Sequence, residues 1–268
     1  MEHRHLFLQL SDVHLRADAS TLRGSDSLGN LDRAIAQIAA SPARPQALVL
    51  TGDLADRGEP EAYEMLRRRV GRLGEQLGAQ VVYLPGNHDD RTAFRRHLLG
   101  PASGTGQSDP SDPSDPSDPI RQVHWFGDLR LVSLDTLVPG DDAGALAPSD
   151  LDWLAAQLAD RQAECGTVVA LHHPPITSPI ESMAKIALAR PGDLEAVVAG
   201  SDVSLVLCGH NHHATTGMLG NIPVFAAPAL AYRADAMIES QFVGRPSSAF
   251  ARIDVVDRHP LVTVIPVE

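Results

Sequence analysis

The stretch Val203-Ser204-Leu205-Val206-Leu207-Cys208-Gly209-His210-Asn211-His212-His213 joins an apolar run directly to three histidines. The apolar half predicts a buried strand, and the imidazoles then follow at its carboxyl end. Two histidines two residues apart do not establish a metal site, because surface histidines at a strand end would give the same pattern. The other strand ends in the chain distinguish these two interpretations.

The same arrangement, an apolar run followed by polar groups, occurs at four earlier places in the chain. The runs span residues 5–10, 47–50, 81–84 and 168–171, and they are followed, in order, by Asp12 and His14, by Asp53, by Asn87 and His88, and by His172. In open α/β sheets the ligand site lies beyond the carboxyl ends of the strands. We therefore expect these separate clusters to form one site.

The spacing within two of the clusters also predicts where their side chains point. Residues two apart lie on one side of an extended segment, so Asp12 and His14 are expected to face one centre. The same alternation would direct His210 and His212 toward the centre, while His213 points elsewhere.

Apolar residues at helical spacing lie between the strands. One set is Leu28, Leu31, Ile35 and Ile38, and another is Tyr63, Leu66, Val70, Leu73 and Leu77. A further helix is expected from residue 148, with Ser149 as its candidate N-cap. The runs at 224–226, 249–256 and 261–265 are expected to be antiparallel strands that complete a sheet. The pattern predicts one α/β domain over residues 1–268, a sandwich with two sheets inside and helices outside.

Residues 101–119 interrupt this pattern with Ser-Asp-Pro repeats. Such a composition has no hydrophobic period and cannot bury a core. We expect a solvated surface loop without chemistry, and the alternative is a segment that docks a partner.

Composition excludes several classes of function. The 268 residues carry 34 acidic and 22 basic side chains, a net charge of -12, and no run of basic and aromatic residues predicts binding to a nucleic-acid polymer. The apolar run nearest the N-terminus is too short for a signal peptide or a membrane span. Two cysteines fit a reducing compartment, so we expect a cytoplasmic protein.

The groups at the strand ends combine carboxylate, amide and imidazole. Oxygen and nitrogen donors in this mixture suit Mn²⁺, Fe²⁺/Fe³⁺ or Zn²⁺ better than ions that prefer thiolates. The candidate ligands are enough for two ions if one carboxylate bridges them; they are Asp12, His14, Asp53, Asn87, His172, His210 and His212.

Five blocks in this order resemble the calcineurin-like metallophosphoesterases. They are Asp-x-His at 12–14, Gly-Asp at 52–53, Gly-Asn-His-Asp at 86–89, His at 172 and Gly-His-x-His at 209–212. Three longer stretches, 51–60, 86–90 and 171–175, are similar to class III cyclic nucleotide phosphodiesterases of the actinobacterial type. The resemblance implies a four-layer αββα sandwich with two central mixed sheets flanked by helices, and it also suggests a homodimer.

The resemblance further implies a role for each matching residue. Asp12, His14 and His212 would hold one metal, Asn87, His172 and His210 the other, and Asp53 would bridge them. His88 is not a ligand in the family, and it would stabilise the transition state or protonate the leaving oxygen. Histidines 173 and 213 would lie beside the ligands or at the substrate rim, and acceptors that orient the ligand imidazoles would be Asp56, Asp89 and Asp90.

These roles imply a dinuclear phosphodiesterase in which a metal-bridging hydroxide opens a small phosphodiester, with cAMP converted to 5′-AMP as the leading case. Alternatives within the family are glycerophosphodiester and 2′,3′-cyclic nucleotide hydrolysis, with selectivity expected from residues 176–190 and 209–216. A Ser/Thr phosphatase fits less well, because Pro85 stands where those enzymes carry Arg. Acidic charge argues against a nuclease, and a catalytically silent metal-binding protein would lack a ligand, whereas none is missing here.

Overall fold

The computed structural model describes residues 4–100, 118–160 and 163–268. One sheet has the strand order β13-β12-β1-β2-β3. Three of its strands, β1 (Arg4–Leu10), β2 (Ala47–Thr51) and β3 (Gln80–Leu84), run parallel. The other two, β12 (Ala249–Val256) and β13 (His259–Pro266), extend it by antiparallel pairing.

The second sheet has the order β4-β5-β6-β7-β9-β8. Its parallel part consists of β5 (Leu129–Leu134), β6 (Thr167–Ala170), β7 (Val203–Cys208) and β9 (Ile222–Ala226). Antiparallel strands close its two edges, namely β4 (Arg121–Phe126) and β8 (Thr215–Leu219). A short ribbon pairs β10 (Arg233–Ala234) with β11 (Gly244–Arg245).

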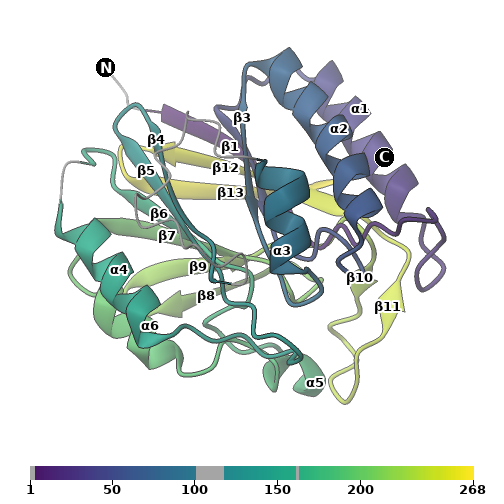
Figure 1. Ribbon diagram of the computed structural model, residues 1–268. Coiled ribbons are helices and arrows are strands. Elements are labelled where there is room, and N and C mark those ends of the chain that lie inside the picture. Colours follow the sequence, from purple (N-terminus) through teal and green to yellow (C-terminus); the bar gives the residue numbers. More distant parts are fainter. Residues whose placement is uncertain (1–3, 101–117, 161–162) are drawn as a thin grey trace.

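Helices cover the outer face of each sheet (Figure 1). The first sheet packs against α1 (Ser27–Ala40) and α2 (Pro60–Leu77), and the second against α4 (Pro148–Ala159) and α6 (Pro191–Val198). The short helix α3 (Arg91–Phe94) continues as a π-helical turn over Arg95–Leu99, and α5 (Glu181–Ala184) lies in the loop after β6.

Alternation along the strands explains the layers. Phe7, Ala47 and Val49 point into the core between the two sheets, where they meet Leu131, Leu207 and other side chains of the second sheet. Their neighbours Leu8, Leu48 and Leu50 point the other way, into the core under α1 and α2. Because both faces are buried, these strands read as continuous apolar runs. The expected αββα arrangement with two mixed sheets is confirmed.

Two local expectations were wrong. The C-terminal runs do not complete a single sheet: β9 lies in the second sheet, parallel to β7, while β12 and β13 belong to the first. Helix α4 begins after Ala147, whose N–H donates to the carboxylate of Asp150 at 2.9 Å. Pro148 occupies the first helical position, where proline is tolerated because a backbone N–H there would have no intrahelical partner. Ser149 therefore lies inside the first turn and is not the N-cap.

Most of the expected Ser-Asp-Pro loop, residues 101–117, lies outside the described residues. Within the three described ranges, no helix combines the length and the apolar composition needed to cross a membrane.

Because His124 on β4 is buried, we expect the folded protein to lose stability as the pH falls. Burial lowers its pKa from 6.5 to about 4, so the unfolded chain binds a proton at this residue in a pH range where the folded chain does not. Stability from this group is present above the unfolded pKa and falls as the pH drops, by about 2 kcal/mol between pH 7 and pH 5. In urea unfolding of metal-free protein, His124→Gln should lose less stability over that interval than the wild type. Equal losses in the two proteins would contradict the assignment.

Candidate metal centre

The carboxyl ends of the parallel strands in both sheets bring the candidate ligands together. Asp12 and His14 follow β1, Asp53 follows β2 and Asn87 follows β3 in the first sheet; His172 follows β6, and His210 and His212 follow β7, in the second. All seven side chains are largely or fully buried except that of Asn87, which is partly exposed. The expectation that these clusters form one site is therefore met by the fold.

Five of the seven candidate ligands have left-handed backbone conformations. Their φ angles are 51° at Asp12, 45° at His14, 52° at Asp53, 69° at His210 and 54° at His212. Such angles are uncommon outside glycine, and each is disfavoured by about 1–2 kcal/mol. They persist where surrounding structure fixes them, which is typical of functional sites. The extended backbone expected at 12–14 and 210–212 was wrong, and residues in left-handed conformations direct these side chains instead.

Asp12, His14, Asp53 and His212 form the first donor group, with ligand atoms all within 4.8 Å of one another. The Nε2 atoms of His14 and His212 lie 3.0 Å apart. His212 Nε2 is 3.4 Å from Asp12 Oδ1, and His14 Nε2 is 3.5 Å from Asp53 Oδ2. A carboxylate pair and two imidazoles thus surround one point.

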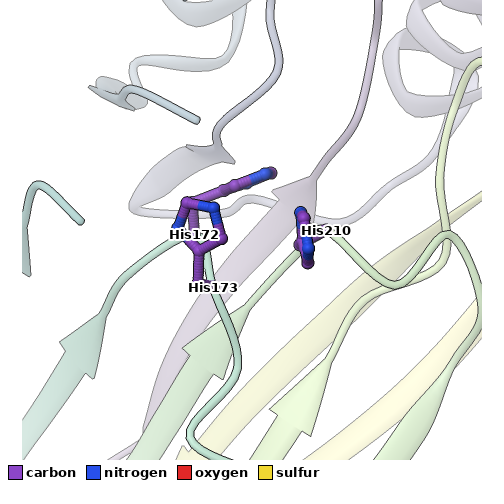
Figure 2. A group of neighbouring side chains, drawn as sticks. All are labelled: His172, His173 and His210. Carbon is purple, nitrogen blue, oxygen red and sulfur yellow. The ribbon is translucent and has the colours of Figure 1, made fainter. Parts of the chain in front are cut away.

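Asn87, His172 and His210 form the second donor group. Asn87 Oδ1 is 3.2 Å from His172 Nε2 and 3.0 Å from His210 Nδ1. Figure 2 shows the rings of His172 and His210 together at the ends of neighbouring strands, with His173 beside them. The Nε2 atom of His210 is buried and has no hydrogen-bond partner among the described residues.

Asp53 lies between the two groups. Its Oδ2 atom is 3.5 Å from His14 Nε2 in the first group and 3.4 Å from His172 Nε2 in the second. Its Oδ1 atom accepts from the backbone N–H of His88 at 2.9 Å. Burial opposes ionisation of this carboxyl, but the neighbouring histidines, His172 above all, outweigh it and hold the pKa well below its usual range.

The outer nitrogens of three imidazoles show which ring atoms are free to bind a cation. His212 Nδ1 donates to the Tyr232 carbonyl at 3.0 Å, and His172 Nδ1 donates to the Thr51 carbonyl at 2.7 Å. His14 Nδ1 lies 3.2 Å from Asp56 Oδ1, to which it donates. A neutral imidazole has one N–H, so each Nε2 presents a lone pair to the centre.

Lone pairs that face one another need a cation between them. His14 Nε2 faces His212 Nε2, and His172 Nε2 faces the oxygens of Asp53 and Asn87. Without a metal ion a proton must fill these gaps, and although burial opposes protonation of His172, the Asp53 carboxylate raises the pKa of that ring to about 9. This donor set fits divalent metal ions, which accept lone pairs from imidazole and carboxylate together. The nitrogen and oxygen donors of both groups therefore suit divalent metal ions.

His88 lies at the edge of the centre, with its side chain 40% exposed. Its Nδ1 donates to the Asp56 carbonyl at 2.8 Å, which leaves Nε2 for a substrate contact. Burial works against protonation of the ring, but the charges of Asp53 and Asp56 outweigh this and raise the pKa above its ordinary value. The ring can therefore carry a proton near neutral pH.

Histidines 173 and 213 contact the scaffold through both ring nitrogens. His173 bonds to the Thr136 hydroxyl at 2.7 Å and the Asp142 carbonyl at 3.2 Å. His213 bonds to the hydroxyls of Ser178 and Thr215. His173 lies close enough to His172 and His210 to join a cluster of possible ligands, but its nitrogens are already engaged, so it packs the second donor group from behind.

Of the three acidic residues expected to orient ligand imidazoles, only Asp56 contacts one, His14. The expectation for the other two was wrong. Asp90 caps α3, where its carboxylate accepts from the Ala93 N–H at 2.8 Å. Asp89 accepts from backbone N–H groups and a tyrosine hydroxyl, and it holds the loops after β2 and β3 together.

Asp89 is a buried clasp with a large expected effect on stability. Its carboxylate accepts from the N–H groups of Leu54, Ala55 and Gly86 and from the Tyr63 hydroxyl at 2.9–3.2 Å. Asp89→Ala leaves these donors unpaired and should lower the free energy of unfolding by about 3–5 kcal/mol. The control Tyr63→Phe removes two hydrogen bonds, from the Tyr63 hydroxyl to Asp89 and from the Asp90 N–H to that hydroxyl, and should cost about 2 kcal/mol. Equal losses in urea unfolding would contradict the clasp.

Two glycines let the loops approach the centre. A Cβ atom on Gly86 would collide with the Asp53 carboxylate, and one on Gly209 would collide with the Ser11 hydroxyl and crowd Asp12. A larger residue at either position would therefore displace groups of the centre. The carbonyl partners Thr51 and Tyr232 were missed by the sequence analysis, because any residue type provides a backbone carbonyl.

Comparisons with known proteins agree with this geometry. Residues 5–214 match the model of a family described as calcineurin-like phosphoesterase. The chain is 38% identical over 236 residues to a probable cyclic nucleotide phosphodiesterase of Rhodococcus erythropolis, covering 88% of this chain and 74% of the relative. It is 39% identical over 232 residues to a cAMP/cGMP dual specificity phosphodiesterase of Mycobacterium tuberculosis, covering 86% and 69%.

A more distant relative and a solved structure extend the comparison. A glycerophosphodiester phosphodiesterase of Enterobacter lignolyticus is 30% identical over 233 residues, covering 85% of this chain and 78% of the relative. The crystal structure of a dimetal phosphatase from Danio rerio superposes with a TM-score of 0.63 at 18% identity, covering 98% of this chain and 99% of that one. This last likeness concerns the fold alone.

Proposed function

The chain belongs to the calcineurin-like phosphoesterase family, and from that premise we propose that it is a dinuclear metal-dependent phosphodiesterase that opens 3′,5′-cyclic nucleotides, cAMP to 5′-AMP in the leading case. The observation that carries the proposal is the position of Asp53 Oδ2, within 3.5 Å of a histidine from each donor group. A single carboxylate oxygen between two sets of lone pairs suits a bridge between two ions.

Each donor group would hold one ion. Asp12, His14 and His212 would bind the first, Asn87, His172 and His210 the second, and Asp53 both. Bound divalent ions would lower the pKa of a coordinated water and polarise the phosphoryl oxygens. The ligand chemistry suits Mn²⁺, Fe²⁺/Fe³⁺ or Zn²⁺.

The chain's own residues would supply the remaining steps. His88 would contact the phosphodiester through Nε2 and donate a proton to the leaving oxygen, a role favoured by the neighbouring carboxylates, which raise the pKa of the ring against the effect of burial. The Asp56 carbonyl fixes that ring through Nδ1, which leaves Nε2 free for the donation. His173 and His213, held by their hydroxyl partners, would support the second donor group and the rim.

Cyclic nucleotide as substrate is supported by the relatives from Rhodococcus erythropolis and Mycobacterium tuberculosis, which are the more similar of the three. Glycerophosphodiester hydrolysis is the second candidate, since the Enterobacter lignolyticus enzyme is 30% identical over most of this chain. We expect residues 176–190 and 209–216 to decide between them, because the donor groups are common to both activities.

Other features follow from the same proposal. A small phosphodiester, not a nucleic-acid polymer, fits the net charge of -12. Two free, buried cysteines fit the cytoplasm. One metallophosphoesterase domain over residues 1–268 and a homodimer complete the proposed description.

A turnover panel tests the substrate. With Mn²⁺ added, we expect cAMP to be converted to 5′-AMP with a kcat/KM at least about 10-fold above those of 2′,3′-cyclic AMP and glycerophosphodiesters, a difference of about 1.4 kcal/mol in transition-state binding. The control is Asp53→Ala protein on each substrate. Faster turnover of a glycerophosphodiester would favour the second candidate, and digestion of single-stranded DNA at a matching rate would contradict the assignment to small substrates.

A further inference from the structure

A second cluster of metal-binding side chains lies at the opposite ends of the strands from the centre described above. His5 is near the start of β1, Asp128 is in the turn between β4 and β5, and Cys165 precedes β6. Their ligand atoms all lie within 4.8 Å of one another. The cluster joins the first sheet, through His5, to two segments of the second sheet.

Both ring nitrogens of His5 face oxygen atoms. Its Nδ1 lies 3.0 Å from Gln46 Oε1, and its Nε2 lies 2.7 Å from Asp128 Oδ1. Both partners are oxygen acceptors, whereas a neutral imidazole has a single N–H. The pairing is completed by a second proton, by a reversed Gln46 amide or by a metal ion between His5 and Asp128. Donation of Nδ1–H to an amide oxygen is the arrangement that fixes a metal-binding histidine with Nε2 free.

Cys165 adds a third donor to the same point. Its thiol hydrogen-bonds to the Asp128 carboxylate, and its side chain is almost fully buried, as is that of His5. A bound cation would have to displace the thiol proton to gain a thiolate ligand.

We propose that His5, Asp128 and Cys165 form a third metal site, separate from the dinuclear centre, for Zn²⁺ or another ion that accepts thiolate, imidazole and carboxylate together. Three such ligands and a water complete a tetrahedron. Neighbouring ligand atoms around zinc lie about 3.3 Å apart, so His5 and Asp128 would separate slightly from their 2.7 Å contact. Asp128 is in a hairpin turn and its side chain is 24% exposed, which leaves it free to move. The bound ion would link the two sheets.

Cadmium titration of the full-length, metal-free chain tests this site, because cadmium bound to thiolate gives a near-ultraviolet charge-transfer band that nitrogen and oxygen ligands do not give. The expected result is a band whose final amplitude corresponds to one thiolate-bound cadmium per chain, in wild type and in the control Cys208→Ala, which removes the other, core-buried thiol. Cys165→Ser should lose the band, and His5→Gln should weaken binding more than about 10-fold.

Two further readouts separate this site from the dinuclear centre and from misfolding. Asp53→Ala should keep the band while losing activity, so failure of the proposed enzyme function would leave the band unaffected. Circular dichroism should show that Cys165→Ser is folded, and Zn²⁺ should raise its Tm less than that of wild type. A folded wild-type chain without the band, or a band that survives Cys165→Ser, would overturn the proposal and leave only the hydrogen bond between His5 and Asp128.

Discussion

Replacing Asp53 with alanine is expected to lower kcat/KM by at least about 1,000-fold, equivalent to about 4 kcal/mol of transition-state stabilisation. The reason is the position of Oδ2 between His14 and His172. Without Asp53 the two donor groups lose the carboxylate they share, and less negative charge would offset the repulsion between two cations. Metal content, measured on the purified variant, should fall together with activity.

A matched control for Asp53 is Asp56→Asn. The Asp56 carboxylate orients His14 through Nδ1, while its backbone carbonyl, which asparagine retains, holds His88. Loss of the carboxylate should therefore reduce activity by about 10–100-fold and leave most of the metal bound. Circular dichroism should show both variants folded. Turnover at the wild-type rate in Asp53→Ala would refute the bridge.

Replacing His88 with glutamine is expected to lower kcat by about 100-fold to 10,000-fold, the range for loss of a general acid. The metals should stay bound, because the contact of residue 88 with Asp53 is made by its backbone N–H, which glutamine retains. Steady-state kinetics and metal analysis of the same sample check both halves of this expectation.

His124→Gln provides the control for His88→Gln, since it makes the same substitution at a histidine on β4, where Gln80 is its hydrogen-bond partner. Its kcat should be unchanged at neutral pH. Loss of metal from His88→Gln would instead identify His88 as a ligand.

The sequence predicted the layers because each strand of the parallel regions is buried on both faces and so forms an unbroken apolar run. Alternate residues such as Phe7 and Leu8 then enter different cores. Strand pairing was less predictable: an apolar run such as 222–226 does not reveal whether its neighbour is parallel, and β9 pairs with β7 and β8 in opposite senses.

The convergence of the ligands was predicted correctly, but from the wrong backbone. Alternation in an extended segment would bring Asp12 and His14 to one side, and left-handed turns produce the same convergence here. Nothing in the residue types announces those turns, because the conformation is imposed by hydrogen bonds from distant segments. Examples are the bonds from the His210 N–H to Asp12 and from the His14 N–H to the Asp53 carbonyl.

The roles of the acidic residues near the ligands were the least predictable part of the site. Asp56 and Asp89 flank similar motifs in sequence, yet one contacts an imidazole and the other collects backbone N–H groups. Their difference depends on how the loops after β2 and β3 fold over each other, which is a tertiary property.

Anomalous scattering at the manganese edge, from crystals of the chain loaded with Mn²⁺, tests the dinuclear centre most directly. The expected map has two peaks about 3.5–4 Å apart on either side of Asp53. One peak should be bound by Asp12, His14 and His212, and the other by Asn87, His172 and His210. A single peak in crystals of active protein, or a pair that Asp53 does not bridge, would contradict the account.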